Sequence, residues 1–289
     1  MPLPLPFLRP KDSFITCRDR DDGGGAQISA RISTMILARL KGMTYAHTPV
    51  SDVAHRPEGV PEAEWAQAWE GFFNLGHGEI QAADLSYPLR PIAKPHRFWP
   101  RSRCLHVVAH CHRLTNHHPE TWAAIAPELQ KKYHLTPKPV LPGYEDGRTQ
   151  IAVHLRRGDV AATGQFAQWF TPDEVILQRL KQVLDVVGRD RASIRVFSEG
   201  KVEDFRAFTD LGAELHLDED VFTTFHHLVK SEVLIMAKST FSYLAAIIGG
   251  GVCLYEPFWH PKLAGWLGPE EVAGSALRAA LARRTVDDR

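Results

Sequence analysis

The chain has 289 residues, of which 44% are hydrophobic and 24% are charged, as in an ordinary globular protein. Its 34 basic residues balance 34 acidic residues, so no global field draws nucleic acid or an anionic membrane to it. A site for an anion must therefore be local.

Several features point to a soluble protein. The segment Met1–Leu8 is apolar but contains three prolines and lacks a basic start, unlike a signal peptide. No apolar run approaches the roughly 18 residues that a membrane-spanning helix needs. The four cysteines show neither metal-ligand spacing nor a disulfide-dense pattern, which fits a reducing compartment. We expect a cytoplasmic protein with no transmembrane segment.

The first 60 residues predict one strand–helix–strand unit. Strands are expected at residues 14–17 and 44–46. The helix between them has an apolar face that includes Ile28 and Ile32, and it ends at Gly42. A glycine-rich turn precedes this helix and points backbone amides at a possible anion. Residues 57–142 are rich in proline and tryptophan and show no sheet pattern, so we expect a mostly helical and irregular segment.

The second half alternates strand and helix patterns. Thr171 as the cap, Pro172 at the first helical position and Glu174 in a capping box predict the start of a helix. Other strands are expected at 193–198, 214–217, 233–237 and 252–255, and other helices at 202–208, 222–228, 241–248 and 269–283. This alternation predicts a Rossmann-like parallel sheet. A linker at 137–147 separates the predicted domains 1–145 and 146–289.

Polar residues follow three of these strands. The buried-strand pattern at 150–153 ends in His154, Arg156, Arg157 and Asp159. Ligands of parallel α/β sheets bind beyond the carboxyl ends of the strands, and arginine grips phosphate oxygens bidentately. Two further polar clusters fall on the same predicted edge: Ser198 with Glu199, and Ser239, Thr240, Phe241 and Ser242.

Metal sites are a competing interpretation. Five histidines gather near Cys104 and Cys111, and His106 and His110 would share a helical face: His106, His110, His112, His117 and His118. Asp19-Arg20-Asp21 and Asp218-Glu219-Asp220 have a form that holds Mn²⁺ or Mg²⁺ in some donor sites. Because arginines are available to neutralise phosphate, we favour a site without metal. The pair His226-His227 is interpreted as ordinary packing.

The motif His154-Leu155-Arg156-Arg157-Gly158-Asp159 resembles the fucosyltransferase superfamily, whose α1,2-, α1,6- and protein O-fucosyltransferases use GDP-fucose. The resemblance extends to Gly25-Ala26-Gln27 before the motif, and to Phe197-Ser198-Glu199 and Ser239–Ser242 after it. It leaves residues 57–142 unmatched. The resemblance implies a two-domain GT-B-like α/β fold, with an acceptor-side first domain and the donor bound in the interdomain cleft.

The resemblance also implies an inverting, metal-independent transfer of fucose from GDP-fucose to a glycan or other hydroxyl acceptor, with no cofactor besides the donor. Arg156 would stabilise the leaving phosphates. The implied donor contacts are Gly25, Ala26, Gln27, His154, Arg157, Ser198, Ser239, Thr240, Phe241 and Ser242. Ala26 stands where many members have asparagine. Asp159 and Glu199 are the candidates for the base.

Two other functions remain open. Because Ala26 replaces the asparagine of many family members, the protein could instead bind a nucleotide sugar or phosphate without catalysis. The histidines between His106 and His118 could instead bind the metal ion of a metalloenzyme.

Overall fold

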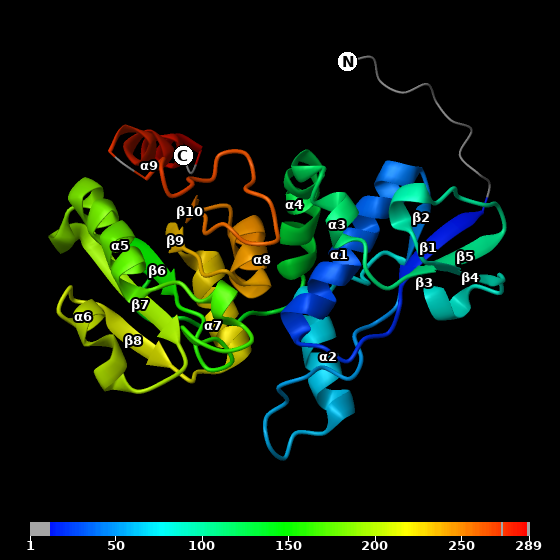
Figure 1. Ribbon diagram of the computed structural model, residues 1–289, viewed down its shortest axis with the longest axis horizontal. Coiled ribbons are helices and arrows are strands. Elements are labelled where there is room, and N and C mark those ends of the chain that lie inside the picture. The colour runs from blue at the N-terminus through cyan, green and yellow to red at the C-terminus, as the bar shows by residue number, and fades with distance from the viewer. Residues whose placement is uncertain (1–11, 273, 288–289) are drawn as a thin grey trace. The chain divides into compact units, whose positions relative to one another are not determined.

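The computed structural model describes residues 12–272 and 274–287, with only the backbone described for 284–287. The chain forms two compact units, Met1–Thr136 and Pro137–Arg289. Each unit contains one five-stranded parallel sheet with helices packed against it (Figure 1). The α/β prediction is therefore confirmed. The predicted linker 137–147 lies at the start of the second unit, and Met1–Leu8 lies outside the described residues.

The sheet of the first unit has the order β3-β2-β1-β5-β4. Its strands are β1 (Ser13–Cys17), β2 (Thr44–His47), β3 (Ile80–Gln81), β4 (Leu89–Ile92) and β5 (Cys104–Val108). The prediction that residues 57–142 contain no strand pattern was wrong, because β3, β4 and β5 all fall there. β3 has two residues and β4 is a largely exposed edge strand containing Pro91, so neither shows an alternating pattern.

Helices cover one face of this sheet. They are α1 (Gly24–Lys41), α2 (Glu62–Phe73), α3 (His112–Thr115) and α4 (Pro119–Tyr133), with short 3₁₀ turns at η1 (Ala82–Asp84) and η2 (Pro95–Arg97). α1 packs on β1 and β2 and ends as predicted at Gly42, whose left-handed backbone closes the helix. Ala82, Leu85 and Tyr87 pack against three buried strand residues, Phe14, Ala46 and Leu105.

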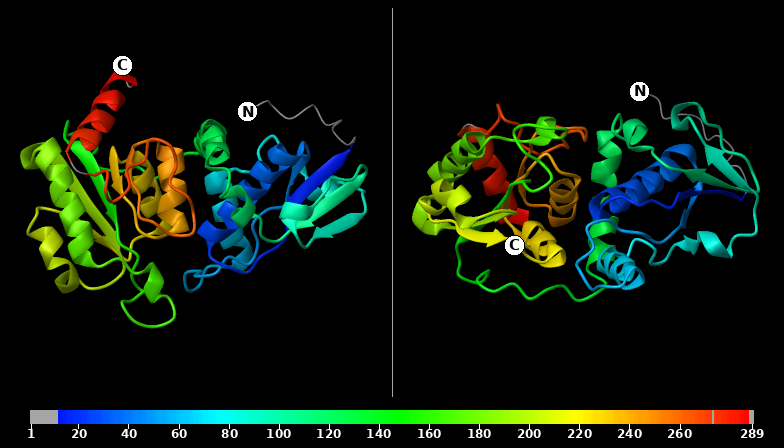
Figure 2. Two further views of the ribbon diagram at one scale, coloured as in Figure 1. Left: turned by 45° about the horizontal axis from the view of Figure 1, so that its top comes forward. Right: turned by 60° about the horizontal axis from the view of Figure 1, so that its bottom comes forward.

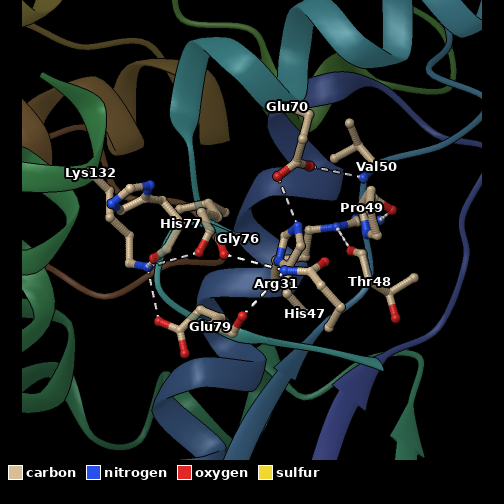
Figure 3. A network of polar contacts seen from close by, with 12 residues as sticks. Arg31, His47, Thr48, Pro49, Val50, Glu70, Gly76, His77, Glu79 and Lys132 are labelled. Carbon is tan, nitrogen blue, oxygen red and sulfur yellow. Dashed lines mark hydrogen bonds and ion pairs between the residues drawn. The ribbon is translucent and has the colours of Figure 1, made fainter. Parts of the chain in front are cut away.

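A buried cation holds the loop after β2. Arg31, fully buried on α1, donates from Nε to the carbonyl of Thr48 at 2.8 Å and from Nη2 to that of Pro49 at 2.5 Å. Next to it, His47 Nε2 lies 2.8 Å from Glu70 Oε1 on α2 (Figure 3). Arg31 on α1 bonds two carbonyls of this loop, and Glu70 on α2 accepts from the Val50 amide, so side chains of both helices hold the loop.

A second buried cation holds the segment after α2. Lys132 on α4 donates to the carbonyl of Leu75 at 3.0 Å and of His77 at 2.5 Å (Figure 3). Its third partner is the carboxylate of Glu79 at 2.9 Å. Both cations therefore have structural partners in the first unit.

The sheet of the second unit has the order β10-β9-β6-β7-β8. Its strands are β6 (Thr149–His154), β7 (Ala192–Ser198), β8 (Glu214–Leu217), β9 (Val233–Ile235) and β10 (Val252–Leu254), close to the predicted positions. The chain steps outward from β6 to β7 and β8, then returns to the other side of β6 for β9 and β10. The strand order therefore reverses between β6 and β9.

Helices cover both faces of this second sheet. The apolar residues of α5 (Asp173–Val187), α6 (Arg206–Thr209) and α9 (Ser275–Asp287) join one core cluster, and α7 (Val221–Lys230) and α8 (Thr240–Gly249) pack together on the opposite face (Figure 2). Three 3₁₀ turns connect elements: η3 (Ala167–Trp169), η4 (Arg189–Arg191) and η5 (Val202–Phe205).

The last helix begins later than predicted. We expected it from residue 269, but α9 starts at Ser275, directly after Gly274 with φ of +62°. Glu271 instead accepts a hydrogen bond from the Gly268 amide at 2.7 Å and forms a turn.

None of the helices in the described part of the chain is long and apolar enough to cross a bilayer. All four cysteines are buried and form no disulfide.

Candidate functional site

The reversal of strand order in the second unit brings two of the predicted clusters together. β6 ends at His154, and the neighbouring strand β9 leads through Ala237 to the start of α8. The ring centroids of His154 and Phe241, in the first turn of α8, are 5.8 Å apart. A helix amino terminus offers free amides to an anion, and ligands of such sheets bind at this reversal. This edge is our candidate site.

His154 has a nitrogen available to a ligand. Its Nδ1 is buried and has no hydrogen-bond partner among the described residues. Burial, followed by the charges of Arg156 and Arg157, lowers the pKa of His154 to about 3. The imidazole is therefore neutral near pH 7, and Nδ1 can serve as either a donor or an acceptor, depending on the tautomer.

Arg156 is held by a local carboxylate. Its Nε lies 3.1 Å and its Nη2 2.6 Å from the two oxygens of Asp159, a bidentate pair three residues apart. The Arg156 side chain is 26% exposed, so the guanidinium is oriented yet open to solvent. A phosphate would share this cation with Asp159. The base role predicted for Asp159 stays a prediction, and its contact here is with Arg156.

Arg157 has a different environment from its neighbour. Its Nη2 donates to the carbonyl of Thr171 at 3.0 Å and pairs with Asp173, and its guanidinium lies 4.3 Å from the ring centroid of Phe170. These contacts tie the loop after β6 to the start of α5. The donor contact predicted for Arg157 stays a prediction, while its observed partners are structural.

A small hollow lies beside these arginines. Its lining residues are His154, Leu155, Arg156, Arg157, Trp169, Thr171, Ile176 and Ala237. Trp169 packs edge-on against Trp259 with ring centroids 4.4 Å apart. Because Trp169 lies in a short 3₁₀ turn without periodicity, sequence reasoning missed it.

Thr171 does not cap α5, contrary to the prediction. The helix begins at Asp173, Pro172 occupies the cap position, and the amides of Val175 and Ile176 bond to the Pro172 carbonyl. The Thr171 hydroxyl is instead buried in the wall of the hollow with no partner in the described structure. An unpartnered buried hydroxyl beside an unpartnered imidazole nitrogen indicates a place for a polar ligand.

The end of β7 joins the same site. Ser198 donates from Oγ to the carbonyl of Leu155 at 3.0 Å, which ties the two loops together. Glu199 reaches the turn at Gly158, since a Cβ built there would lie 1.8 Å from Glu199 Oε2. Gly158 has φ of +74°, a backbone conformation that favours glycine. The structure thus brings both predicted residues of β7 to the loop after β6.

The hydroxyl turn at the start of α8 caps its own helix. Ser239 Oγ accepts from the amide of Phe241 at 3.2 Å, and Ser242 Oγ donates to the carbonyl of Ala237 at 3.3 Å. Ser239, Thr240 and Ser242 are all buried. Contacts between these residues and a donor phosphate stay predictions.

The glycine-rich turn of the first unit lies within a helix rather than before it. α1 starts at Gly24, so Gly25, Ala26 and Gln27 belong to its first turn. Gln27 is fully buried, and its Nε2 lies 2.6 Å from the carbonyl of Ser51, with three other carbonyls within 3.3 Å. The Gln27 side chain therefore holds neighbouring loops, and its predicted contact with a donor stays a prediction.

We predict that Gly24→Ala will destabilise the first unit by about 1–3 kcal/mol, the usual cost of overpacking. A Cβ at Gly24 would lie 2.3 Å from the indole of Trp69, which is buried against the start of α1. Gly71→Ala is the matched control, because a Cβ there meets nothing within 4 Å and alanine favours a helix by about 1 kcal/mol. Urea unfolding measures both. Equal stability of the two variants would contradict this packing.

The acidic triplet Asp19-Arg20-Asp21 ends at the reversal of strand order in the first unit. Arg20 pairs with Asp22, donates to the carbonyl of Ala109 at 2.9 Å and lies 3.0 Å from His110 Nδ1. The Arg20 guanidinium is therefore paired with Asp22, the residue that follows the triplet.

The prediction that His106 and His110 share a helical face was wrong. His106 lies on β5, where its Nδ1 contacts the carbonyl of Phe14 at 2.9 Å, while His110 follows the strand in a loop. In the described part of the chain, the one group of three side chains placed to hold a metal is elsewhere, at His216, Glu219 and His227. Sequence reasoning treated His227 as packing only, because nothing in the local pattern links it to β8.

The free energy of unfolding should decrease as the pH is lowered, because His154 is buried in its neutral form. A histidine of the unfolded chain titrates near pH 6.5, whereas folded His154 has a pKa of about 3. Between these values the unfolded state binds the additional proton, so the free energy of unfolding drops as pH falls, by at most about 1.4 kcal/mol per pH unit.

We predict that His154→Gln will reduce the slope of unfolding free energy against pH between 6.5 and 4, by at most about 1.4 kcal/mol per pH unit, measured by urea unfolding. Thr171→Val is the control: it changes the same hollow without removing a titratable group, so the wild-type slope should persist. Since the Thr171 hydroxyl has no partner, this control should cost little stability. An unchanged slope in His154→Gln would contradict the buried neutral imidazole.

No model of a known protein family matches the sequence, and no curated protein matches it. Among solved structures the chain is similar to the fucosyltransferase NodZ from Bradyrhizobium, with 12% identity, a TM-score of 0.45, and coverage of 81% of this chain and 93% of that chain. POFUT1 in complex with GDP has 11% identity and a TM-score of 0.42, covering 84% and 95%.

A third similar structure is NodZ alpha-1,6-fucosyltransferase soaked with GDP-fucose, with 11% identity and a TM-score of 0.36 over 82% of this chain and 93% of that chain. At TM-scores below 0.5, these likenesses establish neither the fold nor the activity of this chain.

Proposed function

We propose that this protein is a glycosyltransferase that moves fucose from GDP-fucose to the hydroxyl of a glycan or another acceptor. One observation carries the proposal. Where the strand order reverses, His154 lies against Phe241 in the first turn of α8, its Nδ1 has no partner among the described residues, and Arg156 lines the same hollow. A cation, a neutral polar nitrogen and free helix amides suit a nucleoside diphosphate. The resemblance of the motif selects GDP-fucose among such donors.

The reaction forms a bond from the acceptor oxygen to the anomeric carbon and breaks the bond from that carbon to the β-phosphate oxygen. The electron pair leaves on GDP, and the acceptor proton passes to a base. Negative charge grows on the departing phosphate, so Arg156 stabilises the transition state more than the bound donor. We infer an inverting reaction in which this guanidinium does the work of a divalent ion at the phosphates.

The two candidate bases lie beside the same turn. Asp159 follows Gly158 directly, and the Glu199 carboxylate rests against Gly158 from β7. Either carboxylate would have to receive a proton from the acceptor hydroxyl. We expect the first unit to contribute the acceptor side.

Binding of the nucleotide can be tested by thermal unfolding in the presence of GDP, UDP, ADP and their sugars. A ligand at 100 times its Kd adds about 2.7 kcal/mol of stability, which raises the Tm by several degrees for a protein of this size. We expect GDP and GDP-fucose to raise the Tm. A shift only with another base would reassign the donor, and no shift with any nucleotide would refute the proposal.

A non-catalytic role is the second candidate. It is favoured by the pairing of Arg156 with Asp159 at 2.6 Å, which already neutralises the cation, and by alanine at position 26. Such a protein would bind GDP without turning over GDP-fucose. Turnover measurements therefore separate the two functions.

A further inference from the structure

A second polar cluster lies at the far side of the same sheet edge. His216 is near the end of β8, Glu219 is in the turn that follows, and His227 is on α7. One ring nitrogen of each histidine and one carboxylate oxygen of Glu219 all lie within 4.8 Å of one another. Asp218, with φ of +54°, reverses the chain so that Glu219 Oε1 lies 2.8 Å from His216 Nδ1. Strand, turn and helix thus converge on one point.

Both imidazoles have one nitrogen engaged. His216 Nδ1 contacts Glu219, and His227 Nδ1 lies 2.9 Å from the hydroxyl of Tyr144. His216 Nε2 is buried and has no hydrogen-bond partner among the described residues, and Glu214 Oε2 is 3.6 Å away. His227 shows the pattern of a metal-bound histidine, with Nδ1 held by a polar group and Nε2 left for the metal. In His216 the nitrogen on the side of Glu219 is Nδ1, so Nδ1 would join Glu219 as a ligand while Nε2 faces Glu214.

An aromatic ring and an ion pair border the cluster. The ring of Phe197 stacks on His216 at 4.8 Å and lies 5.0 Å from His227, forming an apolar wall. The nearby guanidinium of Arg195 is offset by Glu214, 3.6 Å away.

We propose that His216, Glu219 and His227 form a binding site for one divalent transition-metal ion of the zinc type, with water in the fourth position. Two imidazoles and a carboxylate favour zinc or cobalt over magnesium or calcium, which prefer oxygen ligands alone. Metal–ligand bonds of about 2.0–2.2 Å place the ligand atoms of a tetrahedral site roughly 3.4 Å apart. The three ligand atoms here lie within 4.8 Å of one another, so side-chain movements of about 1 Å would bring them to that separation.

The ion would fasten the turn between β8 and α7. Phe197, which separates this cluster from His154 on β6, pairs directly with His154 across the sheet. The ion therefore lies one strand beyond the proposed donor site. It takes no part in the transfer chemistry proposed above, and this proposal holds or fails independently of that function.

Metal titration of the full chain tests the site. The purified protein is stripped with a chelator and titrated with Co²⁺, whose visible absorption reports tetrahedral coordination, and with Zn²⁺ by calorimetry. We expect one equivalent of either ion to bind, and excess Mg²⁺ to leave the Co²⁺ spectrum unchanged. Absence of saturable binding at one equivalent would overturn the proposal.

Two variants and a control locate the ion. Glu219→Gln and His216→Gln should each weaken Zn²⁺ binding at least 10-fold. His118→Gln should not, although His118 forms a similar pair with Glu120 at 3.2 Å in the first unit. Circular dichroism of the metal-free variants confirms that each is folded. Wild-type affinity in both site variants, or equal loss in the control, would contradict this assignment.

Discussion

Replacing Arg156 with alanine is expected to lower turnover of GDP-fucose by a factor of about 100 or more and to leave the protein folded. Loss of one preplaced donor to a developing oxyanion typically costs about 3–4 kcal/mol in the barrier. The fold should tolerate the change, because the partner of Arg156 is the exposed carboxylate of Asp159, and such surface pairs contribute at most about 1 kcal/mol. The measurement is the initial rate of GDP release, with water as the acceptor.

Arg148→Ala is the matched control for this experiment. Arg148 also pairs with a nearby aspartate, Asp146, at 2.7 Å, but it precedes β6 and lies at the opposite end of that strand from Arg156. Its loss should leave turnover near the wild-type rate. If Arg156→Ala retained near-full turnover, or if both variants lost activity equally, the role assigned to Arg156 would be wrong.

The second large effect is on stability. Glu256→Ala should lower the free energy of unfolding of the second unit by about 3–5 kcal/mol, because it leaves a buried charge without its partner. Arg179 on α5 and Glu256 after β10 are 5% and 6% exposed, and they form an ion pair through Nη1 and Oε2. The pair anchors α5, whose Ile176 lines the hollow one turn earlier.

The double variant Arg179→Met with Glu256→Leu controls for packing. Replacing both charges with apolar groups of similar size is often neutral or stabilising, so most of the lost stability should return. Urea unfolding at pH 7 measures wild type, Glu256→Ala and the double variant. A loss below about 1 kcal/mol in the single variant would show that water or another group compensates Arg179.

The sequence predicted the second unit well for a physical reason. Its inner strands are short continuous apolar runs separated by amphipathic helices, and this alternation is a strong local signal. The parallel arrangement then brings the carboxyl ends of β6, β7 and β9 to one edge, so the sequence pattern alone predicts that His154, Ser198 and Ser239 lie at that edge.

Local patterns failed where tertiary packing decides the outcome. β4 is an edge strand interrupted by Pro91, so its pairing with β5 leaves no trace in residue alternation. Nothing local separates Arg156 from Arg157, and only the positions of Asp159 and Asp173 show that one is oriented at the surface and the other pinned to α5.

The contact between His216 and His227 is also tertiary. It depends on α7 folding back over β8, with ring centroids 5.1 Å apart. The sequence presents these histidines as separate features, one in a strand and one in a helix. Their common environment next to Phe197 becomes visible only when the strand and the helix are packed.

The most direct test of the proposed function is turnover of GDP-fucose by the purified protein, measured as release of GDP with and without candidate hydroxyl acceptors. We predict release of GDP, at least by slow transfer to water, which Arg156→Ala reduces about 100-fold or more. Binding of GDP with no release of GDP from GDP-fucose, under conditions where the protein is folded, would contradict a transferase and leave a binding protein.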